Sequence, residues 1–284
     1  AFEKLDFLVV IDLFRNRTAR MADVILPASS CFEKTQLNRA YMRNSPVIIQ
    51  NQVIDWLGES RPDWKILFAL GRRLGFEKEF PWQTAEEAID YQLEPANLSV
   101  DLLRKNPEGL RATPLQYEKY RTQGFSTPSG KVEFFSERLQ NQGHLPVPFM
   151  EGLDENPISF ADVLGEEAFI GMSGERTNRF THTQFHNIPF LNKRESEGFV
   201  DVHPEDARNK NIAEGQKLRV SSPRGSIRMK ARISPVVHPG SIRIAWGWGE
   251  VDPELNVNNL TDDNRRDPVT GTPSNRSFMC LVQT

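Results

Sequence analysis

The strict alternation of side chains over residues 217–233 constrains the fold more than any other feature of this sequence. Apolar residues take every second position on both sides of a Pro-Arg-Gly segment, and mostly basic residues fill the positions between them. The apolar positions are Leu218, Val220, Ile227, Met229, Ala231 and Ile233. A period of two predicts a β-hairpin with one buried and one solvated face.

The flanking residues extend this pattern into a barrel. Ile242 and Ile244 flank Arg243 in the same alternation. One short helix is expected at residues 204–207, where a proline is followed by two acids in the first turn. Short strands with one brief helix predict a small closed β-barrel, which we assign to residues 160–284.

The N-terminal residues predict an α/β unit. Residues 7–11 form a short apolar run rich in β-branched side chains, which is typical of a strand buried on both faces. Asp12 ends this strand. Residues 18–22 predict a short crossover helix, and residues 24–26 predict a second strand that Pro27 closes. We assign residues 1–150 to this unit together with a long connection.

Two helices are expected further along this unit. Ser60 is the predicted cap of the first, Pro62 and Asp63 suit its first turn, and Gly75 stops it after an apolar stripe over residues 64–74. A capping box at residues 84–87 predicts a second helix through residue 93. Residues 94–165 are rich in Pro and Gly and predict an irregular connection, with the crossing between domains near residues 146–157.

Charge and composition exclude several classes of protein. The 35 Lys and Arg residues nearly balance the 38 Asp and Glu residues, which argues against a broad basic surface for nucleic acid. No apolar run approaches the ~20 residues of a membrane-spanning helix. Two distant cysteines, Cys31 and Cys280, cannot form a zinc ribbon or a cysteine-bound iron–sulfur cluster. We expect both to be small buried thiols, with a disulfide as the alternative.

Three short patterns fit known ligand motifs poorly. Residues 124–131 lack the spacing and the closing Ser/Thr of a phosphate loop, which favours a structured turn. His182 and His186 are four residues apart, which is the spacing of two zinc ligands on a helix. Their neighbours favour extended structure instead, so we expect both to be polar histidines of a loop. The acidic residues between 262 and 267 lack the spacing of a calcium-binding EF-hand, which favours a solvated loop.

Polar residues gather instead at predicted strand ends and in loops. Asp12 stands where open α/β sheets bind their ligands. Residues 173–176 and 179–183 follow the first predicted barrel strand, and residues 256–261 carry three Asn and one Thr. Arg suits pyrophosphate, whereas Asp, Asn and Thr suit the edge of a heterocycle. These residue types allow a nucleotide-like ligand, with an ordinary surface-loop role as the alternative.

The order and spacing of a series of short motifs cover nearly the whole chain. They are residues 9–12, 18–19, 22–27, 33–34, 61–64, 127–133, 182–183, 203–207, 215, 247–249, 256–261 and 267–268. Together they resemble the C-terminal portion of the molybdopterin oxidoreductases of the dimethyl-sulfoxide-reductase type, including the molybdopterin dinucleotide-binding domain.

The resemblance implies an α/β plus β fold, namely a Rossmann-like α/β unit followed by a double-psi β-barrel. It implies bis(molybdopterin guanine dinucleotide) carrying molybdenum or tungsten as the cofactor. Asp12 would receive the guanosine with Lys34 and Asp63 nearby, and Arg176, His182 and Thr183 would lie along the pyranopterin and phosphates. The residues that the resemblance assigns to the cofactor are Asp12, Lys34, Asp63, Gly174, Arg176, His182, Thr183, Asn258 and Arg276. It assigns no catalytic residue and no metal ligand to this chain.

Two local departures distinguish the chain from the family pattern. The usual Thr-x-Thr after the first strand is Asn16-Arg-Thr18 here, which affects the expected guanosine contact. The usual Gly-Arg is Gly174-Glu-Arg176, which is one residue longer and changes the expected position of the arginine.

The resemblance further implies a piece of a larger enzyme. The family's iron–sulfur segment and metal-ligand loop lie upstream of the matched region, so they would be partners from the parent chain. A further partner that the family allows is an electron-transfer subunit. On this interpretation the chain alone has no cofactor bound and no activity. The alternative is a stand-alone binding or assembly module that uses the same barrel.

Overall fold

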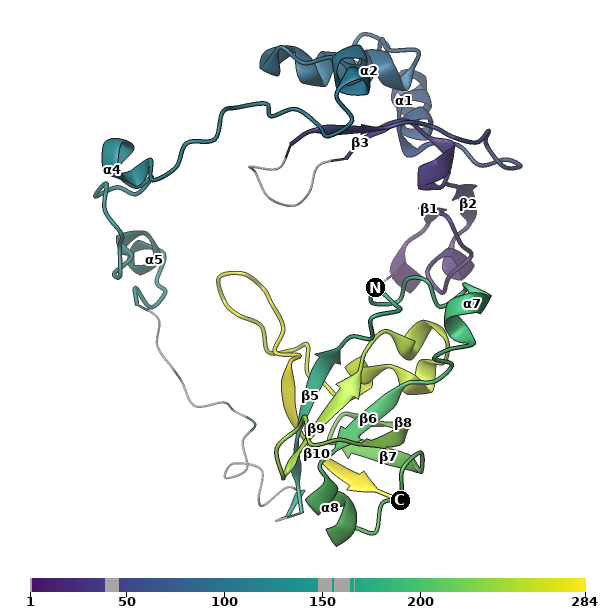
Figure 1. Ribbon diagram of the computed structural model, residues 1–284, viewed down its shortest axis with the longest axis vertical. Coiled ribbons are helices and arrows are strands. Elements are labelled where there is room, and N and C mark those ends of the chain that lie inside the picture. The colour runs from purple at the N-terminus through teal and green to yellow at the C-terminus, as the bar shows by residue number, and fades with distance from the viewer. Residues whose placement is uncertain (1, 39–45, 148–154, 156–163, 166) are drawn as a thin grey trace. The chain divides into compact units, whose positions relative to one another are not determined.

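The computed structural model describes residues 2–38, 46–147, 155, 164–165 and 167–284. The chain divides into two compact units, Ala1–Lys131 and Val132–Thr284 (Figure 1). The crossing that we expected near residues 146–157 falls largely outside the described residues. Among the described residues, no helix is both long and apolar enough to span a membrane.

The first unit combines short strands with helices. Its strands are β1 (Val9–Asp12), β2 (Val24–Pro27), β3 (Gln36–Asn38) and β4 (Ile48–Gln50), and its α-helices are α1 (Asp63–Arg73), α2 (Ala85–Leu93), α3 (Val100–Lys105) and α4 (Tyr120–Gln123). The parallel pairing of β1 with β2 joins Val9 to Val24 and Asp12 to Pro27. Between these two strands lies a single 3-10 turn, Ala19–Met21, in place of the expected crossover helix.

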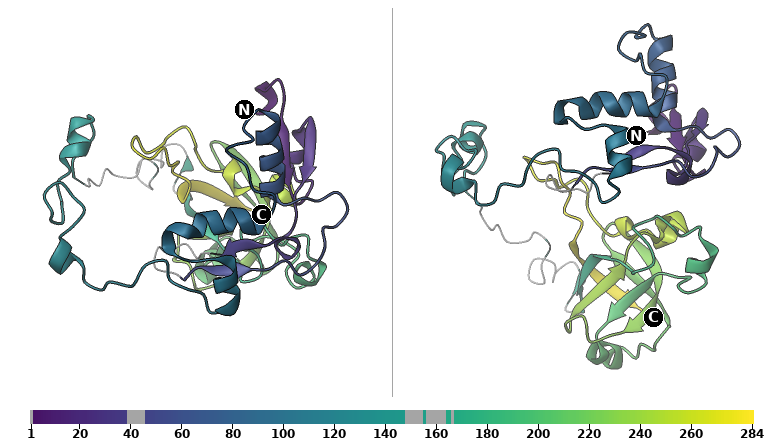
Figure 2. Two further views of the ribbon diagram at one scale, coloured as in Figure 1. Left: turned by 90° about the horizontal axis from the view of Figure 1, so that it is seen from above. Right: turned by 45° about the horizontal axis from the view of Figure 1, so that its top comes forward.

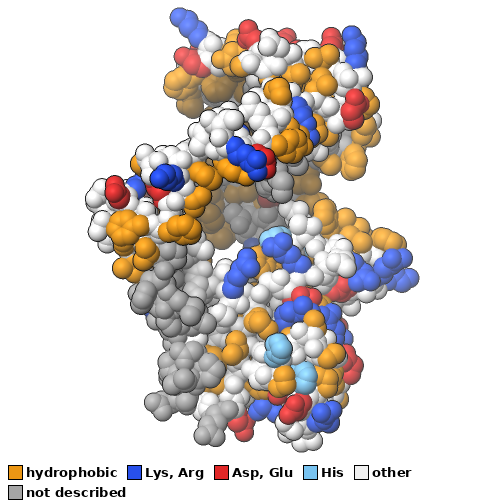
Figure 3. Space-filling model, turned by 60° about the vertical axis from the view of Figure 1, so that its left-hand side comes forward, with side chains coloured by type: hydrophobic (Ala, Val, Ile, Leu, Met, Phe, Trp, Pro, Cys, Tyr) orange, Lys and Arg blue, Asp and Glu red, His pale blue; other side chains and the backbone are white. Residues whose placement is uncertain are grey.

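The expectation that the first strand is buried on both faces is wrong. Phe7 is 64% exposed and precedes the strand, and Val9 is 43% exposed. The sheet that contains β1 has two strands in the described part of the chain, so little of this unit covers its faces. Figure 3 shows hydrophobic side chains at the surface of this unit.

Helices and a second sheet build the core of the first unit. Leu103 of α3 is fully buried together with Val100, and both pack in one cluster with Ile89 of α2 and Ile49 of β4. Antiparallel pairing of β3 with β4 places this hairpin against the helices. The predicted irregular connection therefore begins later than expected, because α3 belongs to the core.

The two predicted helix starts differ in their outcome. Thr84 caps α2 as expected, since its hydroxyl accepts the backbone N–H of Glu87 at 3.2 Å. Ser60 does not cap α1, because its hydroxyl donates to Glu33 at 2.7 Å and the helix begins after Pro62. At the other end of α1, Gly75 takes a φ of 90°, which favours glycine after a helix.

The second unit is a closed barrel. Its strands are β5 (Phe169–Glu175), β6 (Phe199–Val202), β7 (Lys217–Ser222), β8 (Gly225–Ile233), β9 (Ser241–Ala245) and β10 (Ser277–Gln283), and its helices are α5 (Glu137–Asn141), α7 (Pro189–Asn192) and α8 (Pro204–Asn209). The strands close in the order β10-β5-β9-β6-β8-β7, and the right-hand view of Figure 2 shows this barrel in green and yellow. Two of the pairings, β5 with β9 and β6 with β8, are parallel. The predicted barrel, hairpin and short helix are thus confirmed.

The alternation of residues 217–233 accounts for the barrel core. Leu218, Val220, Ile227 and Met229 are all buried, with at most 2% of their surface exposed. Three short 3-10 helices, η5 (Trp248–Glu250), η6 (Pro253–Leu255) and η7 (Val257–Asn259), follow β9, and Trp248 and Leu260 complete the core from this segment. After them, a long loop extends from the barrel before β10 and is drawn in yellow in Figure 1.

A charged cluster also lies within the barrel wall. The carboxylate of Asp201 on β6 is fully buried and accepts hydrogen bonds from Arg232 on β8 and Arg243 on β9. Glu175 at the end of β5 lies 2.9 Å from Arg243 and 3.6 Å from Arg232. Arg232 also stacks on the ring of Phe199. Two carboxylates and two guanidiniums therefore join four strands of the barrel.

The two cysteines are free in the structure and differ in environment. Cys280 is buried as expected, whereas the expectation of a buried thiol is wrong for Cys31, which is exposed on a 3-10 turn. Burial raises the pKa of the Cys280 thiol to about 12, and the charge of Glu155 adds to this effect. Because the thiolate is the nucleophile, the two thiols must differ in reactivity.

We expect Ellman's reagent to modify one thiol of the native chain within minutes and a second thiol only after unfolding in urea. The fast thiol should disappear in Cys31→Ser, which serves as the control. Two thiols that react at the same fast rate in the native chain would contradict the buried position of Cys280.

Candidate functional site

Most of the predicted polar residues of the barrel unit lie near the end of β5. Between Met172 and Glu175 this strand contains one more residue than its partner β9, so the pairing shifts there as a bulge. Gly174 lies in this bulge with a φ of 96°. Glu175 pairs with Ala245 after the bulge, and the guanidinium of Arg176 lies over the ring of Trp246 at 5.6 Å.

A close backbone contact holds the next loop against the end of β9. The ring of His182 packs edge-on against Trp246 at 4.6 Å, and His182 itself has a φ of 57°. At Gly247, where φ is 96°, an added Cβ would lie 2.1 Å from the carbonyl oxygen of His182 and 3.3 Å from the nitrogen of Thr183. The approach of these two chain segments therefore requires glycine at position 247.

His186 packs this loop against aromatic residues of the barrel core. It is buried, stacks on Phe180 at 4.0 Å and contacts Trp248 at 4.6 Å. Its Nε2 lies 3.3 Å from the carbonyl oxygen of His182, and since a carbonyl only accepts, Nε2 carries the proton. Burial lowers the pKa of His186, although the contact with His182 and the charge of Glu195 oppose this effect. The neutral ring tethers the loop that carries His182 and Thr183.

The remaining predicted residues of this unit lie on two other loops. The carbonyl of Arg276 accepts the backbone N–H of Ser173 at 3.0 Å, so the exposed Arg276 lies beside Gly174. Asn258 is exposed on η7, and its N–H donates to the side chain of Asn256 at 3.1 Å. Gly249 lets this segment approach, because a Cβ there would lie 2.8 Å from that of Asn256.

In the N-terminal unit, Asp12 lies at the carboxyl end of β1. Its carboxylate accepts hydrogen bonds from the N–H of Phe14 at 3.0 Å and from the side chain of Asn16 at 2.7 Å. Asn16 in turn accepts the N–H of Ala19 at 2.9 Å. The Asn16-Arg-Thr18 departure thus forms a local turn, and Asp12 has a structural role in that turn.

Lys34 and Asp63 lie together in this unit. Their side chains form an ion pair at 2.6 Å, with the lysine largely buried and the aspartate half exposed at the start of α1. Backbone contacts connect Asp12 with the segment just before Asp63. The N–H of Ala28 donates to the carbonyl of Asp12, and Ala28 also forms a β-bridge with Arg61. The structure therefore places the three predicted residues near one end of the β1–β2 sheet.

Glu33, which precedes Lys34 in the family motif, proves to be structural. Its buried carboxylate accepts the N–H groups of Ser30 at 2.8 Å and Leu57 at 2.7 Å, and the hydroxyl of Ser60 at 2.7 Å. Hydrogen bonding to the Ser30 side chain, followed by that to Leu57 and Ser60, lowers the pKa of Glu33 to about 2. The ionised carboxylate is therefore the form that the fold binds.

We expect Glu33→Gln to lower the melting temperature of the chain by several degrees at pH 7, because an amide replaces an acceptor of several hydrogen bonds. The folded pKa lies below the ordinary value of 4.5, so the stabilisation is complete above pH 4.5 and is lost as pH falls toward 2. Melting curves of both proteins from pH 7 to pH 2.5 should therefore converge. Glu79→Gln, an exposed control, should melt like the wild type, and a constant difference across this pH range would contradict the assignment.

The described residues contain no group of three or more His, Cys, Asp or Glu side chains that could hold a metal ion. His182 and His186 are joined through a backbone carbonyl and not through a shared metal site. Asp262 and Asp267 accept backbone N–H groups of their own loop, as expected for a solvated acidic loop.

Comparison with known families explains this arrangement. Residues 170–279 match the family model of the molydopterin dinucleotide binding domain, and residues 1–73 match that of the molybdopterin oxidoreductase domain. A catalytic chain of Halobacterium salinarum, named as a putative dimethyl sulfoxide reductase, is 29% identical over 259 residues, which cover 87% of this chain and 30% of that protein. This chain belongs to the molybdopterin oxidoreductases.

Other relatives show the same partial coverage. The acetylene hydratase of Syntrophotalea acetylenica is 26% identical over 285 residues, which cover 95% of this chain and 39% of that protein. A solved structure of acetylene hydratase from Pelobacter acetylenicus matches the entire chain with a TM-score of 0.87 at 23% identity, and 41% of that chain is covered. This molybdopterin oxidoreductase chain thus spans about a third of the length of the curated relatives it matches.

The barrel loops fit the anionic part of a molybdopterin dinucleotide chemically. Arg176 and Arg276 are exposed arginines whose backbones lie next to the glycine bulge, and Thr183 and Asn258 offer neutral polar groups. Sequence reasoning missed Trp246, which contacts both Arg176 and His182. Its position before Gly247, between polar loops, is the signal that could have identified it.

Proposed function

We propose that this chain is the cofactor-binding C-terminal portion of a molybdenum or tungsten enzyme that uses bis(molybdopterin guanine dinucleotide). The observation that carries the proposal is the order of the two matched families, with the oxidoreductase domain followed by the dinucleotide-binding domain. On this proposal residues 1–150 are the Rossmann-like part with its connection, and residues 160–284 are a double-psi barrel. The parallel β1–β2 pair and the mixed barrel support this interpretation.

The chain's own residues would divide the binding of the cofactor between them. Asp12 would accept the N1–H and the exocyclic amine of guanine, which adenine lacks as a donor pair. Lys34 and Asp63 would lie beside this contact. Gly174, Arg176, Arg276, His182 and Thr183 would hold the phosphates and the pyranopterin, and Asn258 would close over them. When bound, the cofactor supplies the metal and the electron-accepting pterin for redox chemistry.

Catalysis would then require further parts of a longer parent chain, since the relatives are longer than the matched region. We propose that the partners are an iron–sulfur segment and a metal-ligand loop of the parent chain, and in addition an electron-transfer subunit. The chain alone should therefore be inactive. Turnover of a viologen dye with any small substrate by the purified 284-residue chain would refute this part of the proposal.

The test of cofactor binding is Asp12→Asn in the parent enzyme, with molybdenum or tungsten and released guanine nucleotide measured per protein. We expect loading to fall at least about ten-fold, which corresponds to ~1.4 kcal/mol. Asn16→Ala is the matched control, because it removes a local partner of Asp12 and leaves the carboxylate.

Loading that falls equally in both variants would mean that Asp12 acts through its turn and not through guanine. Normal loading in Asp12→Asn with a lowered melting temperature would lead to the same conclusion. A parent reading frame without a metal-ligand loop would favour a stand-alone binding or assembly module.

A further inference from the structure

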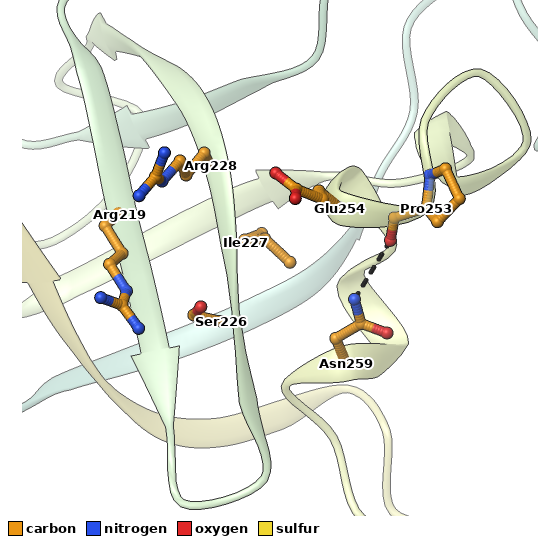
Figure 4. Close-up of a pocket in the computed structure, with 7 residues that line it drawn as sticks. All are labelled: Arg219, Ser226, Ile227, Arg228, Pro253, Glu254 and Asn259. Carbon is orange, nitrogen blue, oxygen red and sulfur yellow. Dashed lines mark hydrogen bonds between the residues drawn. The ribbon is translucent and has the colours of Figure 1, made fainter.

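A pair of cavities lies along the outer face of the β7–β8 hairpin. The first measures about 450 Å³, and its lining includes Arg219, Arg228, Glu254 and Asn259 (Figure 4). The second measures about 880 Å³ and is also lined by Arg219 and Arg228, together with Lys217. Since the two arginines line both cavities, the hollows adjoin at this pair.

The wall of the first cavity is fixed to the hairpin. The carbonyl of Leu260, just after η7, accepts hydrogen bonds from the side chains of Ser222 and Arg224, both at 2.9 Å. Gly225 lets the chain approach, because an added Cβ would lie 2.7 Å from the carbonyl oxygen of Asn259. Asn259 also donates to the carbonyl of Pro253 at 3.1 Å, which joins η6 to η7. The cavity is therefore preformed.

Two positive charges lie side by side on the β7–β8 hairpin. Arg219 and Arg228 are directly opposite each other in the antiparallel β7–β8 register. Like charges in that position repel and destabilise a sheet. Arg232 and Arg243, on β8 and β9, are neutralised by Asp201 and Glu175, whereas the guanidiniums of Arg219 and Arg228 make no ion pair or hydrogen bond within the described residues.

The two adjoining cavities form a groove along the β7–β8 hairpin. We propose that this groove binds a short acidic segment of a partner protein, whose carboxylates pair with Arg219 and Arg228. Two adjacent guanidiniums suit carboxylates through bidentate hydrogen bonds. Lys217 lies two residues before Arg219 on the same face of β7, so the cations repeat at the spacing of alternate side chains in an extended chain, about 6.6 Å.

The walls favour a protein segment over nucleic acid. Glu254 borders the first cavity and would repel an unbroken row of phosphates, whereas Glu167 of the second cavity is paired with Lys210 at 2.8 Å. A segment with spaced carboxylates avoids the position of Glu254. The two hollows together also exceed what a single small anion would occupy.

The binding test uses the full 284-residue chain and a fluorescent, capped peptide in which Glu alternates with Ser. At low salt we expect saturable binding that weakens at least about ten-fold in the double variant Arg219→Gln with Arg228→Gln. The matched control is Arg73→Gln with Arg138→Gln, two exposed arginines outside the groove, which should weaken binding less than about two-fold. Inorganic phosphate and single-stranded DNA are tested as competitors.

Thermal stability supplies an independent readout. If the pair is kept for binding, relief of its repulsion in Arg228→Gln should raise the melting temperature by about 1–4 °C while binding weakens. A lowered melting temperature would mean that the pair is structural. Equal loss in the control variant, tighter binding of DNA, or full competition by phosphate at the peptide's own concentration would each overturn the proposal.

Discussion

Alanine at position 247 should destabilise the barrel unit by roughly 3 kcal/mol. Gly247 has a φ of 96°, and a Cβ there would lie 2.1 Å from the carbonyl oxygen of His182. The substitution therefore combines backbone strain with an overlap against main chain, which cannot rotate away as a side chain could. We expect the loop at residues 182–183 to move, the contact of His182 with Trp246 to be lost, and urea unfolding to shift accordingly.

Gly240→Ala is the matched control for this prediction. Gly240 has a similar positive φ of 76°, but an added Cβ there meets no atom within 4 Å. Gly240→Ala should lower the free energy of unfolding by about 1 kcal/mol, which is the backbone strain alone. Equal losses in the two variants would show that the approach of His182 to Gly247 is not tight in solution. If the proposed function is correct, Gly247→Ala in the parent enzyme should also lower cofactor loading, whereas Gly240→Ala should not.

Asp201→Asn should lower the free energy of unfolding by a similar amount, because it removes a buried charge. Asp201 is fully buried and accepts hydrogen bonds from Arg232 and Arg243, which remain 41% and 28% exposed. Removal of the charge leaves two guanidiniums, on the two strands that flank β6, without their main counter-ion. Breaking a buried pair costs about 3–5 kcal/mol, and the partial exposure of the arginines reduces our expectation to about 2–4 kcal/mol. Urea unfolding at pH 7 measures this loss.

Two further variants test this cause. Glu197→Gln removes the exposed partner of Lys230 on the same barrel and should change the unfolding free energy by less than about 0.5 kcal/mol. Combining Asp201→Asn with Arg243→Met should cost less than the sum of the single changes, because one unpaired cation has been removed. Strict additivity would contradict a shared charged cluster.

Local pattern was sufficient for the barrel hairpin and for several helix ends. A period of two is a direct consequence of strand geometry, so Leu218 and Met229 had to face the same core once the segment was a strand. The hydroxyl of Thr84 caps its own helix because its partner lies three residues away. Family resemblance, carried by motif order, was confirmed by both family models.

Other features depended on partners far away in the sequence. Ser60 has the composition of a helix cap, yet its hydroxyl binds Glu33, which lies 27 residues earlier. Residues 7–11 have the composition of a buried strand, but burial requires neighbouring elements to cover both faces, and Val9 remains exposed. Composition describes what a segment tolerates, whereas burial depends on what packs against it.

The sequence by itself determined the closed barrel, the α/β character of the first unit and the family, since short-range periodicity and motif order carry that information; the cofactor residues stay a prediction. Only the tertiary structure decided that Gly247 must lack a side chain, that Asp201 is the buried counter-ion of two arginines, and that Arg219 faces Arg228 without a partner among the described residues. The physical reason is that each of these facts is a distance between segments. Such a distance exists only when strand register and loop packing have brought those segments together.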